Sequence, residues 1–186
     1  MVLNKGEKDM FDKFLKYVNY NNNIVCNSVD EFLTYTSGKT FLNGLYTIFK
    51  RDDVEKWNNI IGEYFLKYRG TFSVLGYDWM GRVFVIDNNS KMVKMFDPEE
   101  RACYATDMDI IKFHEEIVDD TNGMLSLNYY NQWIEKNEQK KVKYGECVGF
   151  KVPLSLGGKD ELDNLEKIDM EVYWTITLDI NDAINK

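Results

Sequence analysis

The sequence predicts an α+β fold in which an antiparallel β-meander is flanked by helices and preceded by an N-terminal helical segment. Apolar residues recur at helical spacing before residue 66 and again after residue 107. Between these stretches lie short β-branched or aromatic runs separated by turn-forming residues. Helices and strands grouped in separate runs are typical of α+β folds, whereas α/β folds alternate them.

Two helices are predicted near the N-terminus. In the segment 7–18, apolar residues recur every three or four positions, so one helical face can be buried. Ser28 and Glu31 have the spacing of a capping box, in which the serine accepts an amide hydrogen bond and the glutamate reaches back. A short helix is therefore expected over about 28–36.

A third helix is predicted ahead of residue 66. Asp52 and Glu55 repeat the capping-box spacing at its start. The apolar residues that follow share one helical face, and they are Val54, Trp57, Ile60, Ile61 and Phe65.

From residue 71 the spacing changes to that of strands. Four short runs carry it, at residues 72–74, 82–86, 92–96 and 102–104. Turn formers separate them, among them Gly76, Gly81 and the Asp97-Pro98 pair. This pattern predicts an antiparallel meander.

Helical spacing resumes near Asp107 and again over about 125–137. The last apolar stretch, 170–180, fits two patterns. Its residues alternate as in a strand, yet a helical stripe through Met170, Trp174 and Thr177 fits as well. Periodicity alone favours a strand there.

Composition excludes several classes of function. The chain has 186 residues, enough for one sizeable core, and no apolar run approaches the ~18 residues of a membrane-spanning helix. Three widely spaced cysteines fit a reducing compartment, so a cytoplasmic location is expected. A net charge of -8 argues against a nucleic-acid partner and favours a basic protein as partner.

Candidate catalytic and metal-binding patterns are weak. His114 is the one histidine and lacks the second histidine of a zinc-protease motif, so a surface or partly packed side chain is expected. The three cysteines are too far apart for a zinc site, and the 119–123 loop lacks the first and last ligands of a calcium loop. In the 157–160 segment, Asp160 follows Lys159 where a phosphate-binding loop needs serine or threonine. No catalytic residue, cofactor or metal site is predicted.

The stretch GYDWMGRVFVID (76–87) combines an acid, an indole and an arginine. We interpret it as two strand segments joined by a turn, in which Asp78 binds backbone amides and Trp79 covers the end of the hairpin. Gly76 and Gly81 are expected to supply backbone conformations that other residues resist. A hydrolase that uses Asp78, Asp87, Asp97 and His114 is the competing hypothesis; it requires these side chains to converge in a cleft.

This stretch, together with VKMFDPE (93–99) and YGECVGFKVPLSLGGKDELDNLEKIDMEVYW (144–174), resembles the C-terminal domain of bacterial immunity proteins that protect against DNase effectors of the type VI secretion system. FLNGLYTIFKRDDVEKW (41–57) resembles the GAD-like segment that accompanies it. Together the similar segments span about 40–178, and residues 1–38 resemble nothing known.

The two N-terminal helices predicted from spacing form a helical extension over 1–38, which the resemblance does not cover. The resemblance implies one compact GAD-like plus immunity-type α+β unit over 39–186. It also implies a terminal helix over about 169–184, in place of the strand that periodicity favours. By the same resemblance, the chain is expected to be a non-catalytic antitoxin that binds and blocks a cognate toxin, and the net negative charge favours a basic toxin. A general regulatory protein-interaction module is the alternative.

The partner-contacting residues are predicted to lie largely outside the family motifs, because proteins that share those motifs face different toxins. Residues 159–182 carry eight acidic side chains and two lysines. We therefore predict an acidic rim as the contact surface, with exposed aromatics as anchors: Asp160, Glu161, Asp163, Glu166, Tyr77 and Trp79.

Overall fold

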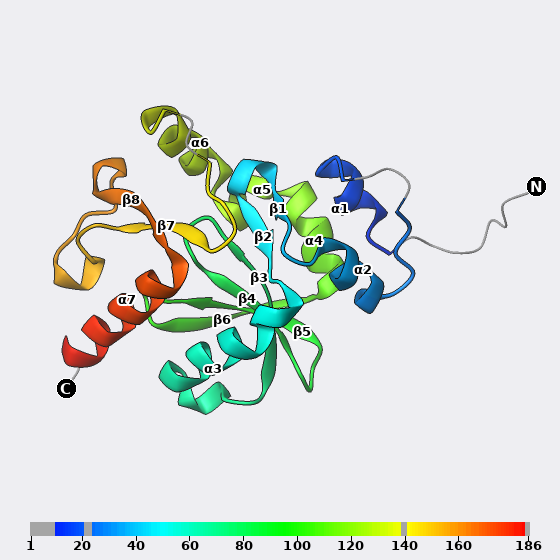
Figure 1. Cartoon of the computed structure of the whole chain (residues 1–186), viewed down its shortest axis with the longest axis horizontal. Helices are drawn as coiled ribbons and strands as arrows, with labels where there is room; N and C mark the ends of the chain where they lie inside the picture. Colours follow the sequence, from blue (N-terminus) through cyan, green and yellow to red (C-terminus); the bar gives the residue numbers. More distant parts are fainter. Residues whose placement is uncertain (1–9, 21–23, 139–140, 185–186) are drawn as a thin grey trace, which may run out of the picture.

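The computed structural model describes residues 10–20, 24–138 and 141–184, and the predicted α+β fold is confirmed (Figure 1). Its centre is a six-stranded antiparallel sheet in the order β1-β2-β3-β4-β5-β6. The strands are β1 (Thr40–Phe41), β2 (Tyr46–Ile48), β3 (Phe72–Asp78), β4 (Val83–Asp87), β5 (Met92–Asp97) and β6 (Ala102–Asp109). The four predicted runs became β3 to β6, whereas β1 and β2 were not predicted.

Two helices precede the sheet, α1 (Asp12–Tyr17) and α2 (Val29–Thr36). The predicted cap of α2 is present: Ser28 Oγ accepts from Glu31 N at 3.2 Å, and the Glu31 carboxylate accepts from Asn27 N at 2.7 Å. Phe14 and Phe32 from these helices share one core with sheet residues. The division of the chain at residue 38 stays a prediction.

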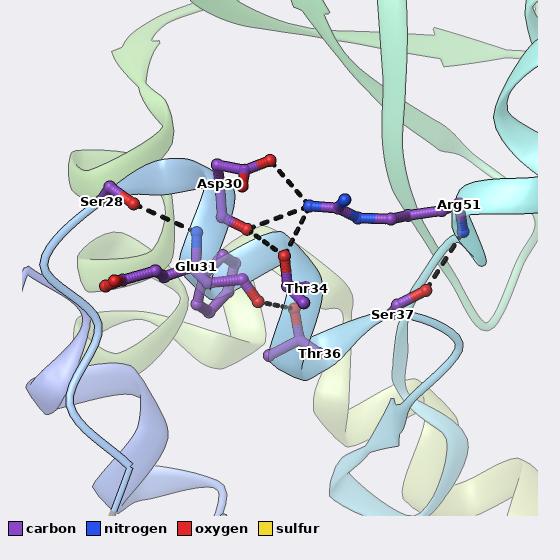
Figure 2. Close-up of polar contacts among 8 residues, drawn as sticks. Ser28, Asp30, Glu31, Thr34, Thr36, Ser37 and Arg51 are labelled. Carbon is purple, nitrogen blue, oxygen red and sulfur yellow. Dashed lines mark hydrogen bonds and ion pairs between the residues drawn. The ribbon is translucent and has the colours of Figure 1, made fainter.

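Arg51 ties α2 to the segment that leads into α3 (Val54–Tyr64), as Figure 2 shows. Its Nη2 donates to the Asp30 carboxylate at 2.7 Å and to the Thr34 hydroxyl at 2.5 Å. Its backbone N–H donates to Ser37 Oγ at 3.1 Å. These groups are exposed, so the ion pair contributes at most about 1 kcal/mol to stability.

The helix α3 forms as predicted, but its start differs. A 3₁₀ turn, Arg51–Asp53, leads into it, and Asp53 at the cap position makes no side-chain capping bond. The capping box expected from Asp52 and Glu55 is therefore wrong, because the backbone ahead of α3 is already helical and leaves no extended cap residue.

Each face of the sheet has its own core. Phe84 of β4 points into the core shared with α1, α2, α4 (Ile110–Asp119), α5 (Thr121–Leu125) and α6 (Leu127–Lys136). Its neighbours Val83 and Val85 point into the second core, with Trp57 of α3 and Trp174 near the C-terminus. This alternation follows from the period-2 geometry of a strand, and it buries both faces of the sheet.

The C-terminal part adds a hairpin and a helix: β7 (Glu146–Phe150), β8 (Leu165–Asp169) and α7 (Met170–Ile184). The terminal helix is confirmed, and the strand that periodicity favoured is wrong. Asp169 starts the helix, because its carboxylate accepts from Glu171 N and Val172 N at 3.0 Å each. The misleading alternation came from outward-facing apolar residues, since Val172 is 45% exposed and Ile176 is 50% exposed.

None of the helices built from the described residues combines the length and the apolar character needed to cross a membrane.

Candidate functional site

The turn between β3 and β4 is built around Asp78, as the sequence predicted. The Asp78 side chain is fully buried; its Oδ1 accepts from Met80 N and Arg82 N at 3.0 Å each, and its Oδ2 lies 2.5 Å from the Arg82 guanidinium. Burial raises the pKa of the Asp78 carboxyl, and the charge of Arg82 opposes that rise. The pair closes the turn and leaves the carboxylate out of reach of solvent.

Both glycines flanking the turn are required, for different reasons. Gly81 has φ 77°, the left-handed region that the sequence interpretation expected. Gly76 lies in β3 where the register against β4 shifts, and its φ is not in the left-handed region, but a Cβ there would lie 2.5 Å from the carbonyl oxygen of Thr47 on β2. The expectation of an unusual backbone conformation at Gly76 is therefore wrong; close strand approach requires the glycine.

The same turn joins the central sheet to the C-terminal elements. The Trp79 carbonyl accepts from Val148 N of β7 at 2.6 Å, and the Gly81 carbonyl accepts from the indole N–H of Trp174 on α7 at 2.7 Å. The Tyr77 hydroxyl accepts from Gly145 N at 2.7 Å. The stretch 76–87 is thus a structural joint.

Tyr77 and Trp79 are not exposed anchors, so that part of the sequence prediction is corrected. They are 1% and 0% exposed. The Trp79 indole N–H donates to the Leu125 carbonyl at 2.9 Å, and the rings of Tyr130 and Trp133 pack around it. The hairpin end is covered by α5 and α6, which the sequence could not place against it.

The four predicted rim acids lie on the exposed segment that leads into and along β8. Asp160, Glu161, Asp163 and Glu166 are all exposed. Asp160 accepts from the Tyr129 hydroxyl at 3.1 Å, and Asp163 pairs with Lys136. Glu166 forms no ion pair within the described ranges. Contact with a partner at this rim stays a prediction.

A pocket of about 230 Å³ lies beside the rim. Its lining combines four carboxylates with three aromatic rings, namely those of Asp97, Glu99, Glu100, Asp160, Tyr129, Phe150 and Tyr173. Arg82 also belongs to the lining and offsets part of the negative charge. Because carboxylates and aromatic faces both attract cations, the pocket suits a lysine or arginine side chain.

Two of the pocket acids also hold the surrounding loops in place. The Asp97 carboxylate accepts from Glu99 N at 2.9 Å and from Glu100 N at 3.2 Å. The Glu99 carboxylate accepts from the Tyr173 hydroxyl at 2.9 Å and from Leu154 N at 3.3 Å. Burial raises the pKa of both carboxyls. Glu99 and Glu100 were missed by sequence reasoning, because the Asp97-Pro98 signal indicated only a turn.

The four residues of the hydrolase hypothesis do not converge in one cleft: Asp78 and Asp97 lie near the same Arg82 side chain, whereas Asp87 and His114 lie elsewhere. Asp87 sits at the far end of β4, where its carboxylate accepts from Lys94 Nζ at 2.6 Å and this bond lowers its pKa. His114 is 1% exposed in the core under α1 and α2, against the expectation of a surface or partly packed side chain. Its Nε2 lies 3.2 Å from the Tyr46 hydroxyl, and burial lowers its pKa to about 4.

The short-motif interpretations can also be compared with the structure. The 119–123 segment contains the junction of α4 and α5, which Asp120 alone separates, with the Asp120 carboxylate accepting from Gly123 N at 2.8 Å. It is the helix-joining turn that the missing calcium ligands indicated. Cys26 and Cys147 are fully buried, and Cys103 is half-buried.

Comparison with known proteins gives a family for the C-terminal part and a fold for the whole. Residues 110–181 match the family model described as T6SS immunity protein Tdi1, C-terminal. The chain is similar in structure to Atu4351 from Agrobacterium tumefaciens, with a TM-score of 0.61 and 13% identity over 96% of this chain and 81% of that one. At this identity the similarity shows the fold alone. No curated protein sequence matches the chain.

The family match contains the predicted rim, β7, β8 and most of α7. The GAD-like resemblance of residues 41–57 lies outside it and stays a prediction. Over residues 110–181, the chain matches the family of type VI secretion immunity proteins, which confirms the resemblance of its C-terminal part to that family.

Proposed function

We propose that the chain is a cytoplasmic immunity protein that neutralises a secreted nuclease toxin by binding it, without catalysing a reaction. The observation that carries the proposal is the immunity-family match over 110–181. That segment supplies the four rim acids, of which Asp160 also lines the pocket, and the pocket residues Tyr129 and Tyr173. The family match therefore contains the whole rim, whereas three of the four pocket carboxylates, those of Asp97, Glu99 and Glu100, precede it in the chain.

The charge of the rim and pocket supports a nuclease as the toxin. A nuclease holds the phosphates of its substrate with clustered lysines and arginines. An acidic surface on the inhibitor is complementary to such a cluster and can raise the association rate by about 10 to 1,000-fold at low salt. Covering those basic residues would also keep DNA from the active site.

The rim and pocket together offer the features of a protein interface. A stable interface buries roughly 1,200 to 2,000 Å², with a few well-packed residues supplying most of the affinity. The pocket of about 230 Å³ has room for a basic side chain, and Asp160 belongs both to its lining and to the rim. We infer that a lysine or arginine of the toxin enters the pocket while its neighbours face the rim.

A titration tests this function. The toxin encoded beside the gene for this chain is purified, and its nuclease activity is measured at increasing ratios of this protein. A binder abolishes activity at one equivalent and leaves the toxin mass unchanged. Full toxin activity at a large excess of folded protein, and failure of the expressed protein to rescue cells from that toxin, would refute the proposal.

The pocket also supports the competing candidate, a carboxylate-dependent hydrolase, because Asp97 and Glu99 are half-buried acids with raised pKa values in one concave site. The same titration separates the two. A hydrolase would inactivate the toxin at far less than one equivalent and would change its mass. Because both acids already hold loops through hydrogen bonds, we favour binding.

A further inference from the structure

The outer edge of β8 carries backbone groups that face away from β7. Lys151 N donates to Asn164 O at 2.8 Å, and Met170 N donates to Gly145 O at 2.9 Å. Hydrogen-bonded and non-hydrogen-bonded residue pairs alternate along an antiparallel ladder. Between these two bonds, the pairs Cys147↔Ile168 and Gly149↔Glu166 are therefore the hydrogen-bonded ones. Lys167 therefore points its N–H and C=O away from β7.

The backbone of Val148 independently confirms this alternation of hydrogen-bonded and non-hydrogen-bonded pairs. It lies opposite Lys167, and its N–H leaves the hairpin to bond the Trp79 carbonyl at 2.6 Å. On the β8 side, the Leu165 N–H bonds Leu162 O. Within the described parts of the chain, no hydrogen bond to the Lys167 N–H, the Lys167 C=O, the Leu165 C=O or the Asp169 N–H is present.

An open edge of this kind is a template for another strand, and natural proteins commonly protect such edges with a lysine. Here the Lys167 ammonium is turned to Glu146 of β7, at 3.1 Å from its carboxylate. The exposed acids Glu166 and Asp169 flank Lys167 on the strand itself. With Asp160, Glu161 and Asp163 ahead of it, the edge is open and its surroundings are acidic.

We propose that the toxin adds an extended, basic segment to the outer edge of β8, pairing with Lys167 through the main chain. The inference rests on the proposed function and specifies how that partner is held. Main-chain bonds supply affinity in this mode, whereas side chains flanking the added strand supply specificity. Lysine or arginine side chains of the added strand would face Glu166 and the rim acids, which suits the charge of the edge.

Amide hydrogen exchange on the wild-type protein tests the geometry directly. The probe is the toxin encoded by the adjacent gene, inactivated by substitution of its own catalytic residue. The amides of Lys167 and Asp169 should exchange freely in the unbound protein and become protected in the complex. The Val148 and Glu166 amides, already bonded, should change little and serve as internal references.

A substitution adds an energetic test. Lys167→Pro removes the outward N–H without touching a β7–β8 ladder bond, and it should weaken binding at least about tenfold, because an added strand loses a hydrogen bond and meets the proline ring. Lys167→Ala is the matched control: it also loses the Glu146 ion pair but keeps the N–H, and should bind within about threefold of wild type.

The outcomes separate the two proposals. Protection at Lys167 and Asp169, with weakened binding by the folded Lys167→Pro protein, supports strand addition. Tight toxin binding without that protection overturns strand addition and leaves the immunity function standing. If the wild-type protein fails to bind the toxin at all, the proposed function fails and the inference fails with it. If Lys167→Pro does not fold, the exchange experiment on the wild type decides alone.

Discussion

The buried pair of Asp78 and Arg82 gives the most specific stability prediction. The Asp78 side chain is 0% exposed and that of Arg82 is 20% exposed, and their charged groups lie 2.5 Å apart. Asp78→Asn leaves the guanidinium charged in a largely buried site without its counter-ion. Breaking such a pair typically costs about 3–5 kcal/mol, because the remaining charge is uncompensated.

We therefore expect Asp78→Asn to lower the free energy of unfolding by about 3 kcal/mol or more, and Arg82→Met to have a similar effect. The double variant should lower the free energy of unfolding by less than the sum of the two single variants, since it removes both charges at once. Urea unfolding followed by tryptophan fluorescence measures all three variants, because the tryptophans buried in the folded chain become exposed on unfolding.

Asp30 and Arg51 provide a matched control with the same chemistry. Their charged groups are 2.7 Å apart, but the side chains are 83% and 53% exposed. Asp30→Asn should cost less than about 1 kcal/mol. Equal small costs at Asp78 and Asp30, or fully additive costs for Asp78 and Arg82, would refute the view that the turn is held by a buried ion pair.

Two further predictions concern other buried positions. Burial lowers the pKa of His114 from 6.5 to about 4, so between these pH values the unfolded chain binds a proton that the folded chain does not. The contribution of neutral His114 to the free energy of unfolding is therefore fully present above pH 6.5, and stability should fall by about 3 kcal/mol as the pH drops to about 4. His114→Gln should remove that share of the pH dependence in urea unfolding, and an identical pH profile would contradict the assignment. Gly76→Ala should lower the free energy of unfolding by about 1–3 kcal/mol, because its Cβ would lie 2.5 Å from the Thr47 carbonyl oxygen. Gly62→Ala is the control: it lies within α3, its Cβ would have its nearest contact at 3.4 Å, and it should be neutral or stabilising in thermal unfolding.

The sequence predicted the elements whose signals are local. Ser28 and Glu31 marked the start of α2, and turn formers bounded β3 to β6, because capping and turn geometry depend on neighbouring residues. The two-residue β1 and three-residue β2 are too short to show a period. Periodicity failed at α7, since Val172 and Ile176 are apolar yet exposed, and only the family resemblance indicated a helix there.

The candidate site was predictable only in part. The rim acids lie within seven residues of sequence, 160–166, in an exposed loop and strand, so composition found them. The pocket brings the 97–100 turn together with Tyr129 and Tyr173, a contact between distant segments that no local pattern encodes. The burial of Tyr77 and Trp79 was missed for the same reason, because α6 and β7 cover them only in the folded chain.

The central claim is that this acidic surface captures a basic toxin. Its most direct test is the association rate of the adjacent-gene toxin, measured against salt concentration for the wild type and for a variant neutralised at Asp160, Glu161, Asp163 and Glu166. A control variant neutralises as many exposed acids elsewhere, at Asp52, Glu55, Glu63 and Glu115. We predict that the rim variant associates at least about tenfold more slowly at low salt and with a weaker salt dependence, and that the control changes little. Rim and control variants with the same kinetics as the wild type would contradict the claim.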